Sequence, residues 1–291
     1  MGAFVLHPAG PFSLLEARRF LAAFAPAGQV VGDEPEHLLL AFAVDGADEV
    51  AAVTVGQVGA EVTGEVVAAS GGIDHHAVRG QVARILSLDA DAQPFADLLA
   101  ADPALAARAA ARPGLRPVLF SSPYEAAAWS VLSARLAAPA AAALRRRVVE
   151  AADAGLRHDG TDLLPFPAPR RLLDADLGAL PPVRAERLRG IARAALEGAL
   201  EPAALRDAAP EDATAGLQRL AGIGPFYASL VLIRGAGARD VLPAGEPRIR
   251  RATAVAYARP QLASDEDAFL AVAERWRPWR SWVAFLLRAT A

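Results

Sequence analysis

The 291-residue sequence contains no cysteine and no lysine. Without cysteine, the chain forms no disulfide and no cysteine-based zinc or iron–sulfur site, which fits a reducing cytosol. Without lysine, it has no side-chain amine for a Schiff base, so a lyase step through such an adduct is excluded. We also see no signal peptide and no run of about 20 apolar residues, so we expect neither export nor a membrane span.

What the chain does have is a large apolar fraction and an uneven distribution of charge. Apolar residues make up 54% of the sequence, which favours a folded protein over a disordered one. The net charge of −3 argues weakly against a nucleic-acid ligand, but residues 1–112 hold 6 arginines and 14 acidic residues, whereas residues 113–291 hold 24 and 19. This asymmetry predicts an acidic supporting part and a mildly basic working part, with chance scatter of surface charge as the alternative.

The hydropathy pattern changes character near residue 88. Segments 37–44, 49–55 and 61–67 are apolar or alternating and rich in β-branched residues, as in strands, and Phe12–Phe24 has the period of a helix. Beyond residue 88 we expect helices at 94–111, 124–152, 184–200, 213–220, 225–234, 263–276 and 279–289. The predicted fold is therefore α+β, with a small antiparallel-sheet domain and helix at 1–88 and a mostly helical domain at 89–291.

The most informative segment lies between two of these helices, in a helix-hairpin-helix pattern at 214–235. Gly222, Ile223 and Gly224 form a tight turn, and Pro225 suits the first turn of the second helix. Free amides in the turn and at the helix start would converge on one spot, which is a seat for a phosphate. An ordinary corner of an all-α domain is the alternative, because such a short glycine motif also occurs by chance.

The hairpin is accompanied by further motifs in a fixed order along the chain. They are Pro113–Arg116, Tyr124-Glu125, Phe166–Leu172, Ala194–Gly198, Arg239–Pro243 and Glu274–Ser281, the last of which contains Trp-Arg-Pro-Trp-Arg. This series resembles the helix-hairpin-helix DNA glycosylases, specifically the bacterial 3-methyladenine DNA glycosylase II type, over nearly the whole chain. The resemblance implies base flipping and hydrolysis of the N-glycosidic bond of damaged, alkylated bases in duplex DNA.

The resemblance also points to the candidate catalytic acid. The carboxylate that stabilises the developing sugar cation in that family is an Asp, and the matching position here is Glu246, which is one methylene longer. A surface carboxylate paired with a nearby arginine is the alternative for Glu246. Asp240 is a second candidate acid, although a role in capping or turn formation fits it better.

The family's flipped-base machinery maps onto changed residues. A Gln and an apolar wedge of the family correspond to Ala134 and Arg135, and arginine retains the ability to fill a gap or hold a phosphate. The implied base pocket comprises Phe226, Tyr227, Arg288 in place of a Trp, and Trp279. Core packing of the last two helices fits Trp276 and Trp279 better than a place in the pocket, because large aromatic residues at helical spacing usually pack inside.

The remaining expectations concern ligands and partners. We expect the turn, Arg135 and the cluster Arg248, Arg250 and Arg251 to contact phosphates, with a solvated helix face as the alternative for the cluster. The resemblance implies no cofactor other than Na⁺ or K⁺ on the carbonyls of Gln218, Leu220 and Ile223. We place His75-His76 in a turn and expect no metal there.

We therefore expect a monomeric, cytoplasmic and nucleoid-associated bacterial protein whose partner is duplex DNA with damaged bases. Two alternatives stay open at this point. The first is an impaired relative that binds DNA or lesions without excision, and the second is a helical protein–protein adaptor.

Overall fold

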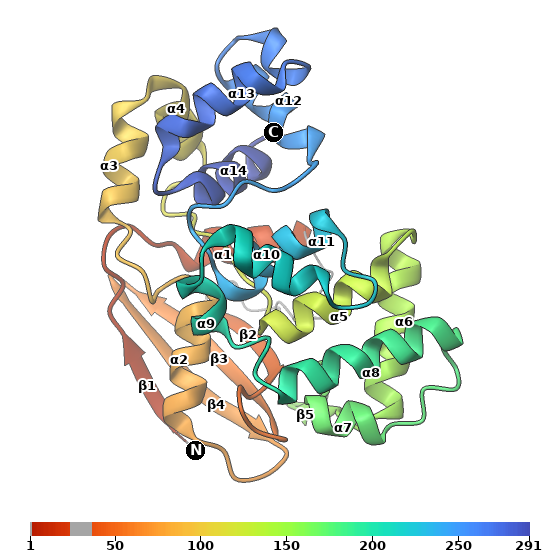
Figure 1. Ribbon diagram of the computed structural model, residues 1–291. Helices are drawn as coiled ribbons and strands as arrows, with labels where there is room; N and C mark the ends of the chain where they lie inside the picture. The colour runs from red at the N-terminus through yellow and green to blue at the C-terminus, as the bar shows by residue number, and fades with distance from the viewer. Residues whose placement is uncertain (1, 24–36) are drawn as a thin grey trace.

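The computed structural model describes residues 2–23 and 37–291 of the chain (Figure 1). An antiparallel sheet is followed by helices, which confirms the predicted α+β class. The sheet has the strand order β1-β4-β3-β2. Its strands are β1 (Ala3–Leu6), β2 (His37–Ala43), β3 (Val50–Val58) and β4 (Glu61–Ala69), and a separate hairpin pairs β5 (Leu156–His158) with β6 (Thr161–Leu163).

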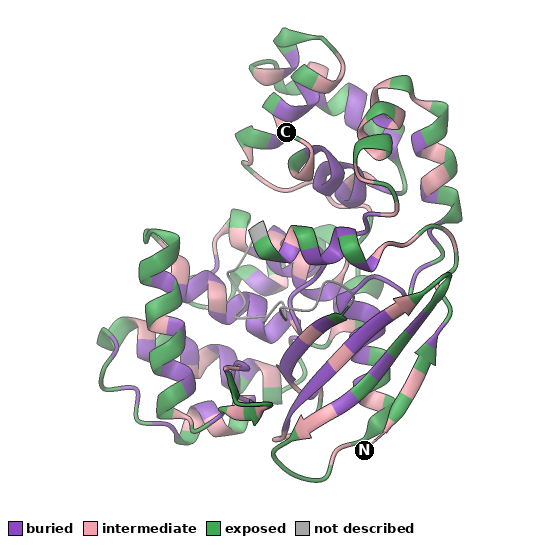
Figure 2. Ribbon diagram, turned by 180° about the vertical axis from the view of Figure 1, so that it is seen from behind, coloured by how far each residue is buried: buried purple, intermediate pink, exposed green. Residues whose placement is uncertain are grey.

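The sheet buries one face under two helices, α1 (Leu14–Ala23) and α2 (His75–Ile85). Alternation along β4 puts Val62 and Val66 into this core and leaves Glu61 and Glu65 exposed. Figure 2 shows the inner strand β3 mostly buried, whereas the edge strand β1 has one buried residue, Leu6, among its four. On the other face, Leu163 of β6 packs against the sheet, so the small hairpin covers part of it.

The structure contains the helix predicted at the start of this region and contradicts the turn predicted near its end. The helix predicted at Phe12–Phe24 is α1, and Phe24 lies outside the described residues. The turn predicted at His75-His76 is wrong, because these residues form the first turn of α2. Asp74 precedes them as the N-cap, and its carboxylate accepts a hydrogen bond from the His76 amide at 2.8 Å.

The middle of the chain builds a second core from helices. Phe120, Leu132, Leu188, Ile223 and Leu232 are among its buried side chains. The elements around it are α5 (Pro123–Ser133), α6 (Ala138–Ala151), α7 (Pro169–Asp174), α8 (Pro182–Leu196), α9 (Pro202–Asp207), α10 (Pro210–Gln218), α11 (Pro225–Leu230) and the π-helix η1 (Val231–Ala236).

A third core joins segments that are far apart in the sequence. The two helices α3 (Gln93–Ala101) and α4 (Pro103–Ala111) lie beside the end of the chain, where Phe95 packs against Trp279 and Trp282 (Figure 1). The C-terminal elements are α12 (Pro247–Ala256), η2 (Pro260–Ala263), α13 (Glu266–Ala273), η3 (Glu274–Trp276) and α14 (Arg280–Ala289). None of the described helices has the length and apolarity that a membrane span requires.

Two long helices expected from the sequence are each divided in the structure. The 94–111 segment breaks at Asp102, whose side chain caps the new helix that Pro103 begins. The 124–152 segment breaks after Ser133, and Arg135 adopts a left-handed backbone with φ of 58°. The flanking alanine-rich residues favour one continuous helix in each segment, but Pro103 and Pro139 stand in the first turn of the helix that follows each break and oppose it.

Arg116 connects the sheet part to the helices. Its side chain is almost fully buried and donates hydrogen bonds to carbonyls of two separate segments, 9–11 and 87–90. The acceptors are the carbonyls of Ala9, Gly10, Pro11, Ser87 and Ala90. Burial lowers the pKa of Arg116 to about 10, so the charge is retained at neutral pH.

We predict that Arg116→Leu lowers the free energy of unfolding by about 3 kcal/mol or more, because buried carbonyls lose their donors. Arg79→Leu is the matched control, since Arg79 is exposed and makes a single 3.4 Å bond. That control should change stability by less than about 0.5 kcal/mol. Equal denaturation midpoints for the two variants would contradict the role given to Arg116.

Candidate functional site

The hairpin is present where the sequence placed it. Helix α10 ends at Gln218, and α11 begins at Pro225 and continues as η1 to Ala236. Ile223 is buried in the central core and its amide donates to the Leu220 carbonyl at 3.0 Å, so the turn is anchored from inside. Within the described residues, the amides of Gly222 and Gly224 have no acceptor in the protein.

A cavity of about 580 Å³ borders this turn. Its walls come from three places in the sequence: the turn itself, the first turns of α8, and the break after α5. The lining residues are Ala134, Arg135, Pro181, Val183, Arg184, Arg187, Gly222, Gly224 and Tyr227. The fold thus brings Arg135 to the hairpin, and we name this cavity the hairpin groove.

Gly222 suits this turn because its φ of 96° lies in the region that favours glycine. The exposed Arg187 side chain lies over the turn, since a Cβ placed on Gly222 would be 2.9 Å from Cδ and 3.4 Å from Nη1 of Arg187. The turn therefore has a cationic side chain beside it.

Arg184 shapes the break that presents Arg135. Its Nη1 donates to the carbonyls of Val131 and Leu132 at 2.6 and 2.9 Å, and its Nη2 donates to the Ala134 carbonyl at 2.9 Å. These carbonyls end α5 and have no continuing helix to bond them. The Arg184 guanidinium donates in place of the missing helix amides, and it thereby fixes the backbone immediately before Arg135.

The groove is positively charged and continues past the hairpin. A second cavity of about 360 Å³ shares Pro181 and Arg184 with it and adds Arg147. Among the described residues that line the two cavities there are four arginines and no carboxylate. Sequence analysis assigned no role to Arg184 or Arg187, and the signal available for them was their place in the predicted helix at 184–200.

Glu246 lies at the start of α12 as its N-cap. Its Oε1 accepts a hydrogen bond from the Arg248 amide at 3.0 Å, and the residue is partly exposed. The loop before it contacts the hairpin helix, because the Ala244 amide donates to Oγ of Ser229 at 3.2 Å. Glu246 itself does not line the hairpin groove.

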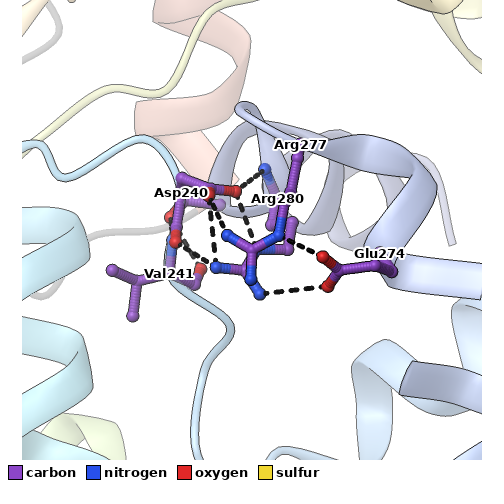
Figure 3. A network of polar contacts seen from close by, with 6 residues as sticks. Asp240, Val241, Glu274, Arg277 and Arg280 are labelled. Atoms are coloured by element: carbon purple, nitrogen blue, oxygen red, sulfur yellow. Dashed lines mark hydrogen bonds and ion pairs between the residues drawn. The ribbon is translucent and has the colours of Figure 1, made fainter. Parts of the chain in front are cut away.

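Asp240 has a different environment from Glu246. Its carboxylate is paired with Arg277 and Arg280 (Figure 3), and it lines a separate cavity of about 680 Å³. It is therefore engaged by protein cations and not directed at the hairpin groove.

The residues predicted for the base pocket occupy two different places. Phe226 is 42% exposed and packs edge-to-face on Tyr227 with ring centroids 5.3 Å apart, on α11. Trp279 is buried with Trp282 in the C-terminal core and lines the Asp240 cavity, while Arg288 is exposed on α14. Phe226 and Tyr227 are thus the aromatic side chains at the hairpin.

The predicted basic cluster is only partly free for an external anion. Arg248 and Arg251 are exposed on α12, whereas Arg250 pairs with Glu266 at 3.5 Å.

The carbonyls proposed for a monovalent cation differ in their hydrogen bonding. Those of Gln218 and Ile223 accept no hydrogen bond within the described residues, and that of Leu220 accepts one. The described part of the chain contains no cluster of three or more His, Cys, Asp or Glu side chains arranged for a metal ion.

Comparison with known proteins places this geometry in context. No family model matches the chain. It is 34% identical to DNA-3-methyladenine glycosylase 2 of Escherichia coli over 184 residues, which cover 62% of this chain and 61% of the relative. It is 30% identical to a probable bifunctional transcriptional activator/DNA repair enzyme AlkA of Mycobacterium tuberculosis over 203 residues, 68% of this chain but only 40% of that relative.

Solved structures extend the likeness to the whole chain. The 3-methyladenine DNA-glycosylase from Archaeoglobus fulgidus superposes with a TM-score of 0.77 at 23% identity, covering 99% of this chain and 97% of that one. An 8-oxoguanine glycosylase/lyase from Clostridium acetobutylicum gives a TM-score of 0.72 at 16% identity, with 100% and 97% covered. At these identities the two structures establish the shared fold.

The chain thus shares the fold of helix-hairpin-helix DNA glycosylases and is similar in sequence to DNA-3-methyladenine glycosylases, which supports the resemblance that the motifs predicted.

We predict that Arg184→Gln lowers the free energy of unfolding by about 1–3 kcal/mol, because buried carbonyls at the end of α5 lose their donor. Amide exchange should accelerate at residues 134–137, which hydrogen-exchange mass spectrometry measures. Arg193→Gln on the same helix is the control, since Arg193 pairs with exposed Glu186. Unchanged exchange at 134–137 in the Arg184 variant would show that it does not hold the break.

Proposed function

We propose that this protein is a monofunctional DNA glycosylase that releases alkylated bases from duplex DNA. The observation that carries the proposal is the hairpin groove, where unpaired turn amides, Arg135 and Arg187 meet in one cavity without a carboxylate among its described lining residues. Amides and arginines of this kind bind phosphate oxygens and position a duplex without reading its sequence. The names of the curated relatives supply the reaction class.

In the proposed complex the groove holds the backbone on both sides of the flipped nucleotide. Arg135 stands at a break between helices in a left-handed backbone, so its side chain projects from the protein at the groove. We propose that it enters the gap that the everted base leaves, where a guanidinium stacks on neighbouring bases. A monovalent cation on the carbonyls of Gln218, Leu220 and Ile223 would add positive charge against one phosphate.

The acid in the proposed mechanism is Glu246. Leaving of the base takes the electron pair of the C1′–N bond, and the sugar becomes an oxocarbenium-like cation. The Glu246 carboxylate, at a helix N-terminus that favours negative charge, stabilises that cation. Water then adds to C1′ and loses a proton, which leaves an abasic site and the free base.

The base itself would lie against Phe226 and Tyr227. A base alkylated on a ring nitrogen is cationic, and an aromatic face attracts it by about 0.5–2 kcal/mol. The same cationic base is a good leaving group, so modest stabilisation of the sugar cation is enough for release. We therefore propose alkylated purines as substrates, acted on by a cytoplasmic monomer.

We predict that Glu246→Gln lowers the single-turnover rate of base release by about 10²-fold or more, because the charge at the sugar is lost while the shape remains. The assay measures bases released from methylated duplex DNA by chromatography, alongside duplex binding. Glu246→Asp should keep measurable activity, and Asp267→Asn, which removes an exposed carboxylate from α13, should leave the rate unchanged. Duplex binding without any release by wild type would instead support the alternative of a binding module.

We predict that Arg187→Gln weakens duplex binding and reduces the slope of log affinity against log salt concentration by about 1, as expected for one lost phosphate contact. Fluorescence anisotropy between about 50 and 200 mM salt measures the slope. Arg193→Gln lies on the same helix but outside the groove and should leave the slope unchanged. The same slope for wild type, Arg187→Gln and Arg193→Gln would show that Arg187 does not contact a phosphate.

A further inference from the structure

Residues 239–241, which lead toward Glu246, are hydrogen-bonded to Ser281 at the start of α14. The Ser281 amide donates to the Arg239 carbonyl at 2.9 Å, and Oγ of Ser281 accepts from the Val241 amide at 3.0 Å. The same hydroxyl lies 2.7 Å from the Val241 carbonyl. The backbone on both sides of Asp240 is thus held by hydrogen bonds to Ser281, from its amide at Arg239 and from its hydroxyl at Val241.

Asp240 supplies the charged part of this attachment (Figure 3). Its Oδ1 accepts from Nε of Arg280 at 2.7 Å, and its Oδ2 accepts from Nη1 of Arg277 at 2.6 Å. Nη2 of Arg280 also donates to the Asp240 carbonyl at 2.7 Å. Glu274 lies on the other side and pairs with both arginines, so charges alternate through the network.

This network is shielded from water on one side. The Arg280 side chain is 16% exposed and that of Asp240 is 27% exposed. The Glu274 carboxylate is 3.7 Å from Nη1 of Arg280, so Asp240 is the nearer partner of that guanidinium. Removing the Asp240 charge leaves a half-shielded cation with only this longer ion pair, and the segment can then shift.

Only a short stretch separates the network from the candidate acid. Residues 242–245 span the distance, and their described contact with the hairpin helix is the Ala244–Ser229 hydrogen bond. Gly245, with φ of 63°, turns the chain into α12. The segment that carries Glu246 is therefore held at Asp240, at Ala244 and at the α12 cap, and the Asp240 network is the charged attachment among these three.

We propose that Asp240 is a positioning residue that acts through this loop to place the Glu246 carboxylate against the sugar. The inference rests on the proposed function of Glu246 but concerns a residue that does not touch the substrate. A displacement of about 1 Å at a catalytic group costs on the order of 10²-fold in rate, so an anchor at this distance is sufficient to control the reaction.

The test uses two DNA probes that need no turnover. One duplex carries a cationic pyrrolidine ring in place of the deoxyribose, and the other carries a neutral tetrahydrofuran ring. A correctly placed carboxylate favours the cationic ring, so the ratio of the two dissociation constants reports the position of the charge. A purely structural defect weakens binding to both duplexes equally and leaves this ratio unchanged.

We expect wild type to prefer the cationic duplex, and Asp240→Asn to lose at least about 10-fold of that preference while binding the neutral duplex normally. The base-release rate should fall in parallel, and Asp240→Asn should add no further loss in the Glu246→Gln background. Asp89→Asn is the matched control, because Asp89 pairs with Arg206 at 2.6 Å in the same cavity with similar exposure. It should retain the wild-type preference.

The outcomes separate the two proposals. A wild-type preference that survives in Asp240→Asn overturns the positioning role and leaves the proposed function intact. A wild type without any preference overturns the placement of Glu246 and the positioning role with it. Equal losses for Asp240→Asn and Asp89→Asn, or equal weakening toward both duplexes, show a general loss of structure and also overturn the role.

Discussion

The close packing of one helix, Pro225–Ala236, against its neighbours is the constraint on which the rest of the structure depends. Gly235 lies so near Pro123 that a Cβ would come within 2.7 Å of the Pro123 Cα, which seats the helix directly on α5. Arg84 of α2 donates to the Gly235 carbonyl, and the Phe120 amide donates to the Arg234 carbonyl. The sheet, the central core and the hairpin are therefore fixed to the same element, and the groove keeps its shape because its walls share this support.

Several arginines stabilise the fold of this chain through hydrogen bonds and ion pairs inside the protein. Arg116 and Arg184 satisfy carbonyls between helices, and Arg145 forms a buried pair with Glu125 at 2.9 Å. Arg234 lies over the neighbouring rings of Phe20 and Phe285, and burial lowers its pKa to about 9. These guanidiniums bond to carbonyls, carboxylates or rings inside the protein. The arginines that line the hairpin groove therefore form a local positive surface on a protein whose net charge is −3.

The sequence predicted those parts of the fold that depend on local patterns. The strands at 37–43, 50–58 and 61–69 alternate clearly, and the glycines and proline of the hairpin impose a turn whatever the tertiary context. Pro139, in the first turn of α6, is a local signal against one continuous helix over 124–152, but the alanine-rich residues around it hide where the first helix ends. The end at Ser133 depends on Arg184, some 50 positions later, which donates hydrogen bonds to the exposed carbonyls. The groove could not be predicted for the same reason, since its arginines acquire their role from packing at long range.

The position of Glu246 shows how the site combines structure with chemistry. Short side chains such as Asp and Ser are the preferred N-caps, and a glutamate must fold back further to reach the amide two residues on. It makes that bond here at 3.0 Å through one oxygen, which leaves the other oxygen of the carboxylate for a cation outside the helix. In the proposed mechanism this free oxygen faces the sugar, and the loop that Asp240 holds sets its distance from C1′. The glutamate side chain has one more rotatable bond than aspartate, so in that proposal the N-cap hydrogen bond and the Asp240 network have to fix it together.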